Sequence, residues 1–118
     1  MITIKNGKKE LEMHFGLGQL DAIDKALGFT VQDRINLGEG LEMLVPKLES
    51  GNLIAMSKIV KATTRNQKYA PKNDEELEEI LVSLIKEYGS LKKFGEIIIE
   101  ELGKNVLTQD ILNNSKEK

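Results

Sequence analysis

The sequence predicts an α+β fold that is mainly α-helical, in which an N-terminal β-hairpin is followed by about five helices in a single small domain. Three observations lead to this prediction: a hairpin signal at the start, helical spacing of apolar residues through most of the rest, and a length of 118 residues. That length provides one hydrophobic core and is too short for two ordinary domains. We expect one domain over residues 1–112, with the hairpin at 1–16 and the helical part at 17–103, followed by a polar, disordered tail at 113–118.

The hairpin is predicted from Asn6-Gly7, because both residue types tolerate positive φ in a type I′ turn. Apolar residues alternate with polar ones on both sides of this turn, and they are Ile2, Ile4, Leu11, Met13 and Phe15. A lone two-stranded hairpin is marginal in water. Its apolar face must therefore lie on the helices or pair with another sheet edge, and an open edge is a template for another chain.

The next segment predicts a short helix, since Leu20, Ile23 and Leu27 share one face and Gly28 is a natural end. Residues 29–36 show no clean period and predict a loop. Phe29 lies in this loop, where an aromatic side chain either fills the adjacent core or contacts a partner.

A pair of helices over residues 41–64 is predicted as the centre of the core. Gly51 can adopt the left-handed conformation that ends the first helix, and Asn52 can cap the second. Pro46 lies inside the first helical pattern, where it should remove one hydrogen bond and kink the helix. The expected inner faces consist of Leu41, Leu44, Val45 and Leu48, then Leu53, Met56, Ile59, Val60 and Thr63.

Two further helices follow a polar loop at 65–73. Asn73 or Asp74 caps the first of them, and Gly89-Ser90 ends it and caps the second. The expected inner face of the first consists of Leu77, Ile80, Leu81, Leu84, Ile85 and Tyr88. The apolar residues of the last helix, 91–102, spread over roughly 200° of its circumference, about twice the stripe that a surface helix needs. This helix therefore has surplus apolar surface, and Met43, Ile54 and Val82 also fall off the inner faces of their helices.

Composition limits the classes of function. Cysteine is absent, which excludes disulfides and thiolate metal sites, and no apolar run is long enough for a signal peptide or a membrane span. We therefore expect a soluble protein that stays where it is made. The 17 basic and 19 acidic residues give a formal net charge of −2. Nucleic-acid binding normally needs a basic stripe, and none is visible.

Several local patterns could suggest chemistry and are better explained by structure. His14 is the only histidine and is expected to face solvent rather than hold a metal. Gly16-Leu17-Gly18 lacks the third glycine of a dinucleotide fingerprint. The acidic first turn after Asn73 lacks the EF-hand spacing. Because no nucleophile has a paired base, the sequence predicts a protein that is not an enzyme. No metal site is predicted either, because neither His14 nor the acidic turn has the spacing that metal ligands need.

The order of the segments resembles the tail assembly chaperones of siphophages that infect Gram-positive bacteria, lactococcal phages especially. The resemblance covers nearly the whole chain. It is carried by the hairpin and by Phe15-Gly16-Leu17-Gly18-Gln19-Leu20, Asp24 with Gly28, Leu44-Val45-Pro46-Lys47-Leu48-Glu49-Ser50-Gly51-Asn52, Ile59-Val60-Lys61-Ala62-Thr63 and Glu100-Glu101-Leu102-Gly103-Lys104.

This resemblance implies a late, non-virion protein of the host bacterial cytoplasm, without catalytic residues or cofactors. It implies a homo-oligomer that coats the helical tape measure protein until tail tube subunits polymerise around it, with the tail tube protein as a further partner and neither nucleic acid nor membrane as one. Combined with the surplus apolar surface, it predicts a partner-binding surface made of Phe29, Met43, Ile54, Tyr69, Ile97, Ile98 and Ile99. For each of these residues, core packing is the alternative.

Two other classes of function remain open at this point. A virion structural protein such as a head-tail connector or a tail terminator would also oligomerise and lack a catalytic site. A small DNA-binding regulator could use residues 41–64 as a helix-turn-helix, although the acidic balance of charge argues against it.

Overall fold

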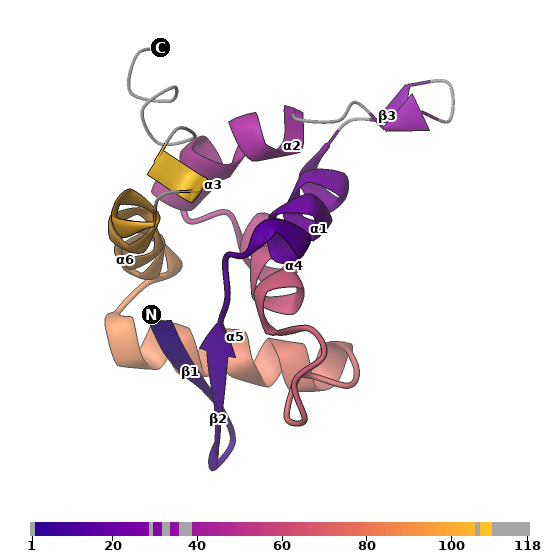
Figure 1. Cartoon of the computed structure of the whole chain (residues 1–118). Coiled ribbons are helices and arrows are strands. Elements are labelled where there is room, and N and C mark those ends of the chain that lie inside the picture. Colours follow the sequence, from indigo (N-terminus) through magenta and orange to yellow (C-terminus); the bar gives the residue numbers. More distant parts are fainter. Residues whose placement is uncertain (1, 29, 32–33, 36–38, 106, 110–118) are drawn as a thin grey trace.

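An N-terminal hairpin lies against a group of helices (Figure 1). The computed structural model describes residues 2–28, 30–31, 34–35, 39–105 and 107–109, and within them the chain forms six helices and two short hairpins. Its principal extents are 38 × 31 × 23 Å. The predicted α+β, mainly helical fold is confirmed, with six helices in place of about five.

The first hairpin pairs β1 (Ile2–Asn6) with β2 (Lys9–Met13) in antiparallel register. Asn6 lies opposite Lys9, so the turn consists of Gly7 and Lys8 rather than Asn6 and Gly7. Gly7 has φ +63°, and among the described non-glycine residues only Asn66 has a positive φ. The predicted type I′ turn is therefore wrong by one residue. Asn6 stays in the ladder because its side chain donates to Tyr69 O at 2.9 Å and to Glu76 Oε1 at 3.1 Å.

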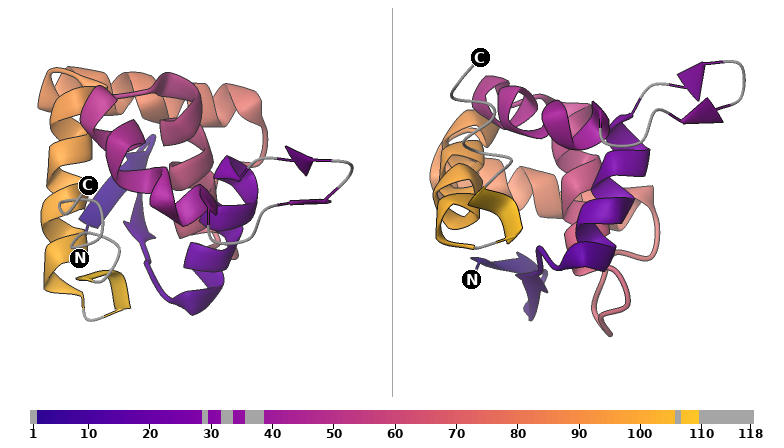
Figure 2. Two further views of the ribbon diagram at one scale, coloured as in Figure 1. Left: turned by 90° about the horizontal axis from the view of Figure 1, so that it is seen from above. Right: turned by 45° about the horizontal axis from the view of Figure 1, so that its top comes forward.

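Helix α1 (Leu17–Leu27) follows and ends at Gly28, as predicted. The region predicted as a loop contains a second antiparallel hairpin, β3 (Thr30–Val31) with β4 (Arg34–Ile35). These strands project from the helical body (Figure 2). Two residue pairs are too few to produce a recognisable alternation, which explains why the sequence pattern missed them.

The predicted kinked helix is two helices, α2 (Glu39–Glu42) and α3 (Leu44–Ser50), separated at Met43. Pro46 lies in the first turn of α3, where a backbone N–H has no partner within its own helix. The prediction of a kink at Pro46 is therefore wrong, because the chain starts a new helix before it. Buried Asp24 joins this region to α1, since its Oδ1 accepts from Leu41 N at 3.0 Å.

The turn between α3 and α4 (Leu53–Thr64) is as predicted. Gly51 has φ +66° and ψ +32°, and Asn52 Oδ1 accepts from Ala55 N at 2.9 Å. A Cβ on Gly51 would also lie 2.7 Å from the backbone nitrogen of Lys92. The glycine therefore allows both the left-handed turn and the close approach of α6.

Helix α5 (Asp74–Tyr88) follows the predicted loop, and α6 (Leu91–Lys104) completes the set. Asn73 Oδ1 accepts from Glu76 N at 2.9 Å, and Ser90 Oγ accepts from Lys93 N at 3.1 Å. Helix α5 crosses behind the hairpin and contacts β1, whereas β2 contacts α4 (Figure 1). After α6, buried Thr108 donates from its hydroxyl to Leu102 O at 2.6 Å.

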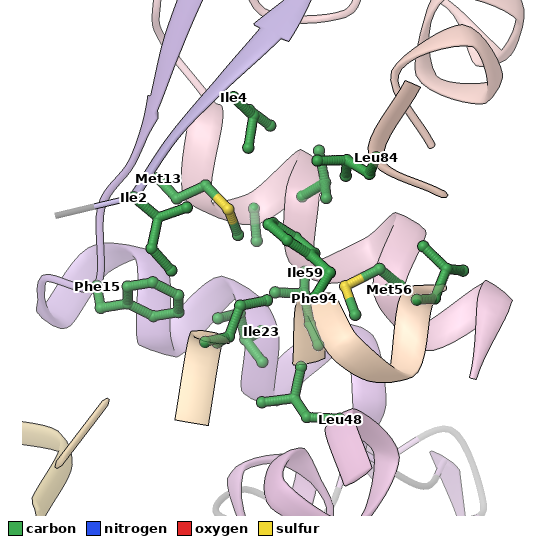
Figure 3. Close-up of a cluster of buried hydrophobic side chains, with 14 of the residues drawn as sticks. Ile2, Ile4, Met13, Phe15, Ile23, Leu48, Met56, Ile59, Leu84 and Phe94 are labelled. Atoms are coloured by element: carbon green, nitrogen blue, oxygen red, sulfur yellow. The ribbon is translucent and has the colours of Figure 1, made fainter. Parts of the chain in front are cut away.

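The core lies where the apolar face of the hairpin meets α1, α3, α4, α5 and α6. Figure 3 shows Phe94 of α6 among side chains from these elements, close to Ile59 and Met56 of α4. The Phe94 ring lies 5.1 Å from the Tyr88 ring, centroid to centroid. The largest side chains with almost no exposed surface are Phe94, Ile4, Leu11, Met13, Ile23, Leu44, Leu48, Met56, Ile59, Ile80, Leu84 and Ile98.

Helices α3 and α6 cross at Gly95. A Cβ at this position would lie 2.2 Å from the Leu48 carbonyl oxygen and 2.9 Å from its carbonyl carbon. Both atoms belong to the backbone of α3 and cannot move aside as a flexible side chain can. Gly95 therefore sets the distance between the two helices.

Candidate partner-binding surface

The apolar side chains that remain exposed in the described part of the chain lie at the starts of two helices, on α5, after α6 and, for Tyr69, in the loop before α5. Leu17 and Leu53 begin helices α1 and α4, Val82 and Ile85 lie one turn apart on α5, and Leu107 follows α6. Among the described residues, the exposed large apolar side chains are Leu17, Leu53, Ile54, Tyr69, Val82, Ile85 and Leu107. Each of these side chains is available to a partner.

Two of these side chains, Leu53 and Ile54, are consecutive in the sequence, with 54% and 61% of their surface exposed. We call them the α4 apolar pair. Ile54 was predicted to lie off the inner face, and it does. Leu53 was predicted to lie on the inner face, and this is wrong. It is the first residue of α4, so it has no preceding helical turn to cover it. Ile85 was also predicted to lie on the inner face of its helix, and this is wrong, because it is 40% exposed in the last turn of α5.

The three isoleucines of α6 occupy different environments. Ile98 has no exposed surface and lies in the core, so its assignment to the partner-binding surface is corrected to core packing. Ile97 and Ile99 are half-buried and pack against the core. The wide apolar arc of α6 arises because the helix is contacted by α3, α4 and α5, so most of its predicted surplus is covered within the protomer.

The remaining predicted surface residues lie apart from the α6 isoleucines in sequence. Met43 is half-buried at the junction of α2 and α3. Tyr69 is 37% exposed, and its ring centroid lies 5.1 Å from Lys9 Nζ and 5.5 Å from Lys68 Nζ. Phe29 lies outside the residues that the structure describes.

A hollow of about 390 Å³ opens between the start of α1 and the end of α6. Its lining includes His14, Phe15, Gln19, Glu101, Asn105 and Leu107. We call it the α1/α6 hollow. Its floor is apolar because Phe15 belongs to the core, and exposed Leu107 stands at its rim. Sequence reasoning missed it, since residues almost ninety positions apart form its two sides.

His14 lines this hollow and has 41% of its side chain exposed, which agrees with the predicted solvent-facing position. Its Nε2 lies 3.6 Å from Glu12 Oε2, and its backbone nitrogen donates to Thr63 O at 3.0 Å. No set of three or more His, Cys, Asp or Glu side chains suited to holding a metal occurs among the described residues.

The pKa of the Tyr88 phenol is raised above its ordinary value of 10.0, mainly by burial and further by the neighbouring carboxylate of Glu87. Tyr88 is half-buried and packs on Phe94 at the edge of the core. Within the described residues, no helix combines the length and the apolar character needed to span a membrane.

Comparison with known families decides between the remaining classes. The family described as phage tail assembly chaperone protein, TAC, matches residues 2–116. The chain belongs to this family. The match includes the hairpin and all six described helices, so the resemblance noted from the sequence is confirmed at the level of the family.

This tail assembly chaperone combines a buried hydrophobic core with a small set of exposed apolar side chains. The association with lactococcal phages stays a prediction. No curated protein and no solved structure matches the chain.

Proposed function

We propose that this tail assembly chaperone assembles into oligomers that bind the hydrophobic helical repeats of a tape measure protein and keep it soluble until the tail tube polymerises around it. The single observation that best supports this role is the α4 apolar pair, because Leu53 and Ile54 are more than half exposed. Apolar side chains left in water on a folded domain are typical of an interaction surface.

A long amphipathic helix exposes apolar side chains at regular intervals, and it aggregates when these are left in water. The α4 apolar pair and the α1/α6 hollow offer sites for such side chains on each protomer. One protomer covers only a short length of helix, so its affinity is low. Many protomers bound along one helix act together, because each additional contact forms at a high effective concentration.

In this proposal the chaperone acts in the host bacterial cytoplasm, is absent from the mature virion and performs no catalysis. The tail tube protein is a second partner, since its polymerisation must displace the chaperone from the tape measure protein. Weak individual contacts suit this exchange, because they dissociate one at a time.

The test is co-expression of the chaperone with the tape measure protein of the same phage, followed by measurement of the tape measure protein in the soluble fraction. We compare the native chain with Leu53→Asn and Ile54→Asn. Ser83→Asn is the matched control, because Ser83 is an exposed helical residue that is already polar.

We expect the native chain and the Ser83→Asn control to keep the tape measure protein soluble and the two α4 variants to reduce its soluble amount several-fold. The proposal would be contradicted if the tape measure protein stays insoluble with the native chain. If it is soluble with all four chains, the α4 apolar pair is not the binding surface.

A further inference from the structure

The two outer edges of the β1–β2 hairpin differ. On the β2 side, Gln67 closes the edge: its Oε1 accepts from Glu12 N at 3.0 Å and its Nε2 donates to Glu12 O. Two residues further along the chain, His14 N donates to Thr63 O at 3.0 Å. A strand cannot add beside β2 because these partners occupy its place.

The β1 edge is open. The backbone N–H and C=O of Glu12 both point outward to Gln67. Glu12 and the opposite residue Thr3 therefore form a non-hydrogen-bonded pair of the ladder. In such a pair the backbone N–H and C=O of Thr3 point away from β2. The same holds two residues along for Lys5, opposite Glu10. Thr3 and Lys5 are exposed, and their outward N–H and C=O groups have no hydrogen-bond partner in the part of the chain that the structure describes.

A hollow of about 220 Å³ borders this edge and is lined by Thr3 and by Ile97, Glu100 and Lys104 of α6. Half-buried Tyr88 also lines it. Figure 1 shows β1 at the outer side of the hairpin, away from α4.

We propose that β1 pairs antiparallel with β1 of a second copy of this chain, so that two hairpins join into one four-stranded sheet. This inference rests on the proposed oligomerisation and names one of its interfaces. The sequence of β1 favours a single register, in which Thr3 lies opposite Lys5 of the second copy and Ile4 lies opposite Ile4.

Charge and hydrogen bonding select this register. It uses the outward groups of both Thr3 and Lys5 on each strand and forms four backbone hydrogen bonds, two for each hydrogen-bonded pair. A shift by two residues in one direction would place Lys5 opposite Lys5, and like charges directly opposite each other are destabilising. In the favoured register each Lys5 faces a threonine, while Glu10 stays beside it within its own hairpin.

Cysteine cross-linking tests this register, because the natural chain has no cysteine. Thr3→Cys and Lys5→Cys are prepared separately, mixed under mild oxidation and analysed for covalent dimer. Directly opposed residues have Cα atoms about 5.5 Å apart, within the range of a disulfide. Two copies of Thr3, or two copies of Lys5, lie two residues out of register, more than about 7 Å apart, and cannot be bridged.

We expect the mixture to form at least five times more covalent dimer than either variant alone. An equally mixed pair of Glu10→Cys and Glu12→Cys, on the closed β2 edge, is the control and should form little. Equal cross-linking in all samples would contradict the register, because it would report random collision.

A second variant tests the hydrogen bonding without a thiol. Thr3→Pro removes one outward N–H that the hairpin does not use, and Glu10→Pro does the same on the other edge. We expect Thr3→Pro to weaken self-association at least tenfold, measured by sedimentation at several concentrations, and Glu10→Pro to leave it unchanged. Circular dichroism verifies that both variants fold.

The two proposals fail separately. If the native chain is oligomeric but the mixture gives no selective cross-link and Thr3→Pro associates normally, pairing through β1 is wrong and the proposed function stands. If the native chain is monomeric at all concentrations, both pairing through β1 and oligomerisation are wrong. If β1 pairs as described but the tape measure protein stays insoluble, only the chaperone role is overturned.

Discussion

Gln67 lies across the edge of β2 and bonds to both backbone groups of Glu12, as a neighbouring strand would do. The two residues are 55 positions apart, and the bond ties the loop after α4 to the hairpin. A side-chain amide carries one donor and one acceptor in nearly the geometry of a peptide group. Gln67 therefore protects one edge of the sheet, and the other edge is left open.

Replacement of Gln67 tests this contact. We expect Gln67→Ala to lower the free energy of unfolding by about 1 kcal/mol, because it removes two hydrogen bonds that are partly exposed. Urea unfolding followed by circular dichroism measures the change. Gln19→Ala serves as the control and should have a smaller effect, and equal losses in both variants would contradict the role of Gln67.

The crossing of α3 and α6 leads to a second prediction. Gly95→Ala should destabilise the fold by more than about 2 kcal/mol, because the new Cβ collides with the Leu48 backbone and forces the helices apart. Gly18→Ala is the matched control, since its Cβ would meet only the end of the Arg65 side chain. There the better helix propensity of alanine should keep stability unchanged or raise it by up to about 1 kcal/mol. Thermal unfolding of both variants distinguishes these outcomes.

Ile54 and Ile98 were both predicted from the sequence as surface residues and differ in the structure. We expect Ile98→Ala to lower the free energy of unfolding by about 2 to 5 kcal/mol, because it leaves a cavity in the core. Ile54→Ala should change it by less than about 0.5 kcal/mol. Denaturant titrations of the two variants measure both values, and similar effects would contradict the placement of Ile98 in the core.

Tyr88 leads to a prediction about pH. Because its pKa is raised in the folded chain, the native state favours the protonated phenol. Its contribution to stability is full below the ordinary pKa of 10.0 and is lost as the pH rises through the raised value. Tyr88→Phe cannot ionise, so its stability should fall less steeply above about pH 10 than that of the native chain. Urea unfolding at several alkaline pH values tests this, and identical slopes would contradict it.

The features that were predicted correctly depend on local interactions. Asn52, Asn73 and Ser90 cap helices within three residues of themselves, and Gly51 ends a helix through its own backbone conformation. Such signals are contained in a few neighbouring residues. The hairpin was predicted from signals of the same local kind, the alternation of apolar residues around Asn6-Gly7. The family resemblance came instead from the order of motifs along nearly the whole chain.

The features that were missed depend on distant residues or on helix ends. Periodicity assigned Leu53 to an inner face but could not show that the first turn of α4 extends past its neighbours. Ile98 was assigned to the surface because the sequence of α6 does not show how many helices pack against it, and in the structure α3, α4 and α5 all do. The turn at Gly7-Lys8 is shifted because Asn6 is held in the ladder by contacts with Tyr69 and Glu76.

The exposure of the candidate surface residues was predictable only in part for the same reason. Ile54 was predicted to be exposed from the pattern of its own helix, and both Ile54 and Tyr69 are exposed. Their role in partner binding stays a prediction. The α1/α6 hollow is formed by elements from opposite ends of the chain, so no local pattern indicates it. The hairpin signal predicted two sheet edges, and contacts with the distant residues Gln67 and Thr63 decide that the β2 edge is the closed one.

The stoichiometry of the complex with the tape measure protein tests the central claim most directly. The purified complex is separated by size exclusion, and its mass is measured by light scattering. We predict one tape measure chain with many copies of this 118-residue protein, and fewer copies when the tape measure protein is shortened. A stable complex with a single copy, or no complex at all, would contradict the account of an oligomeric tail assembly chaperone that coats its partner.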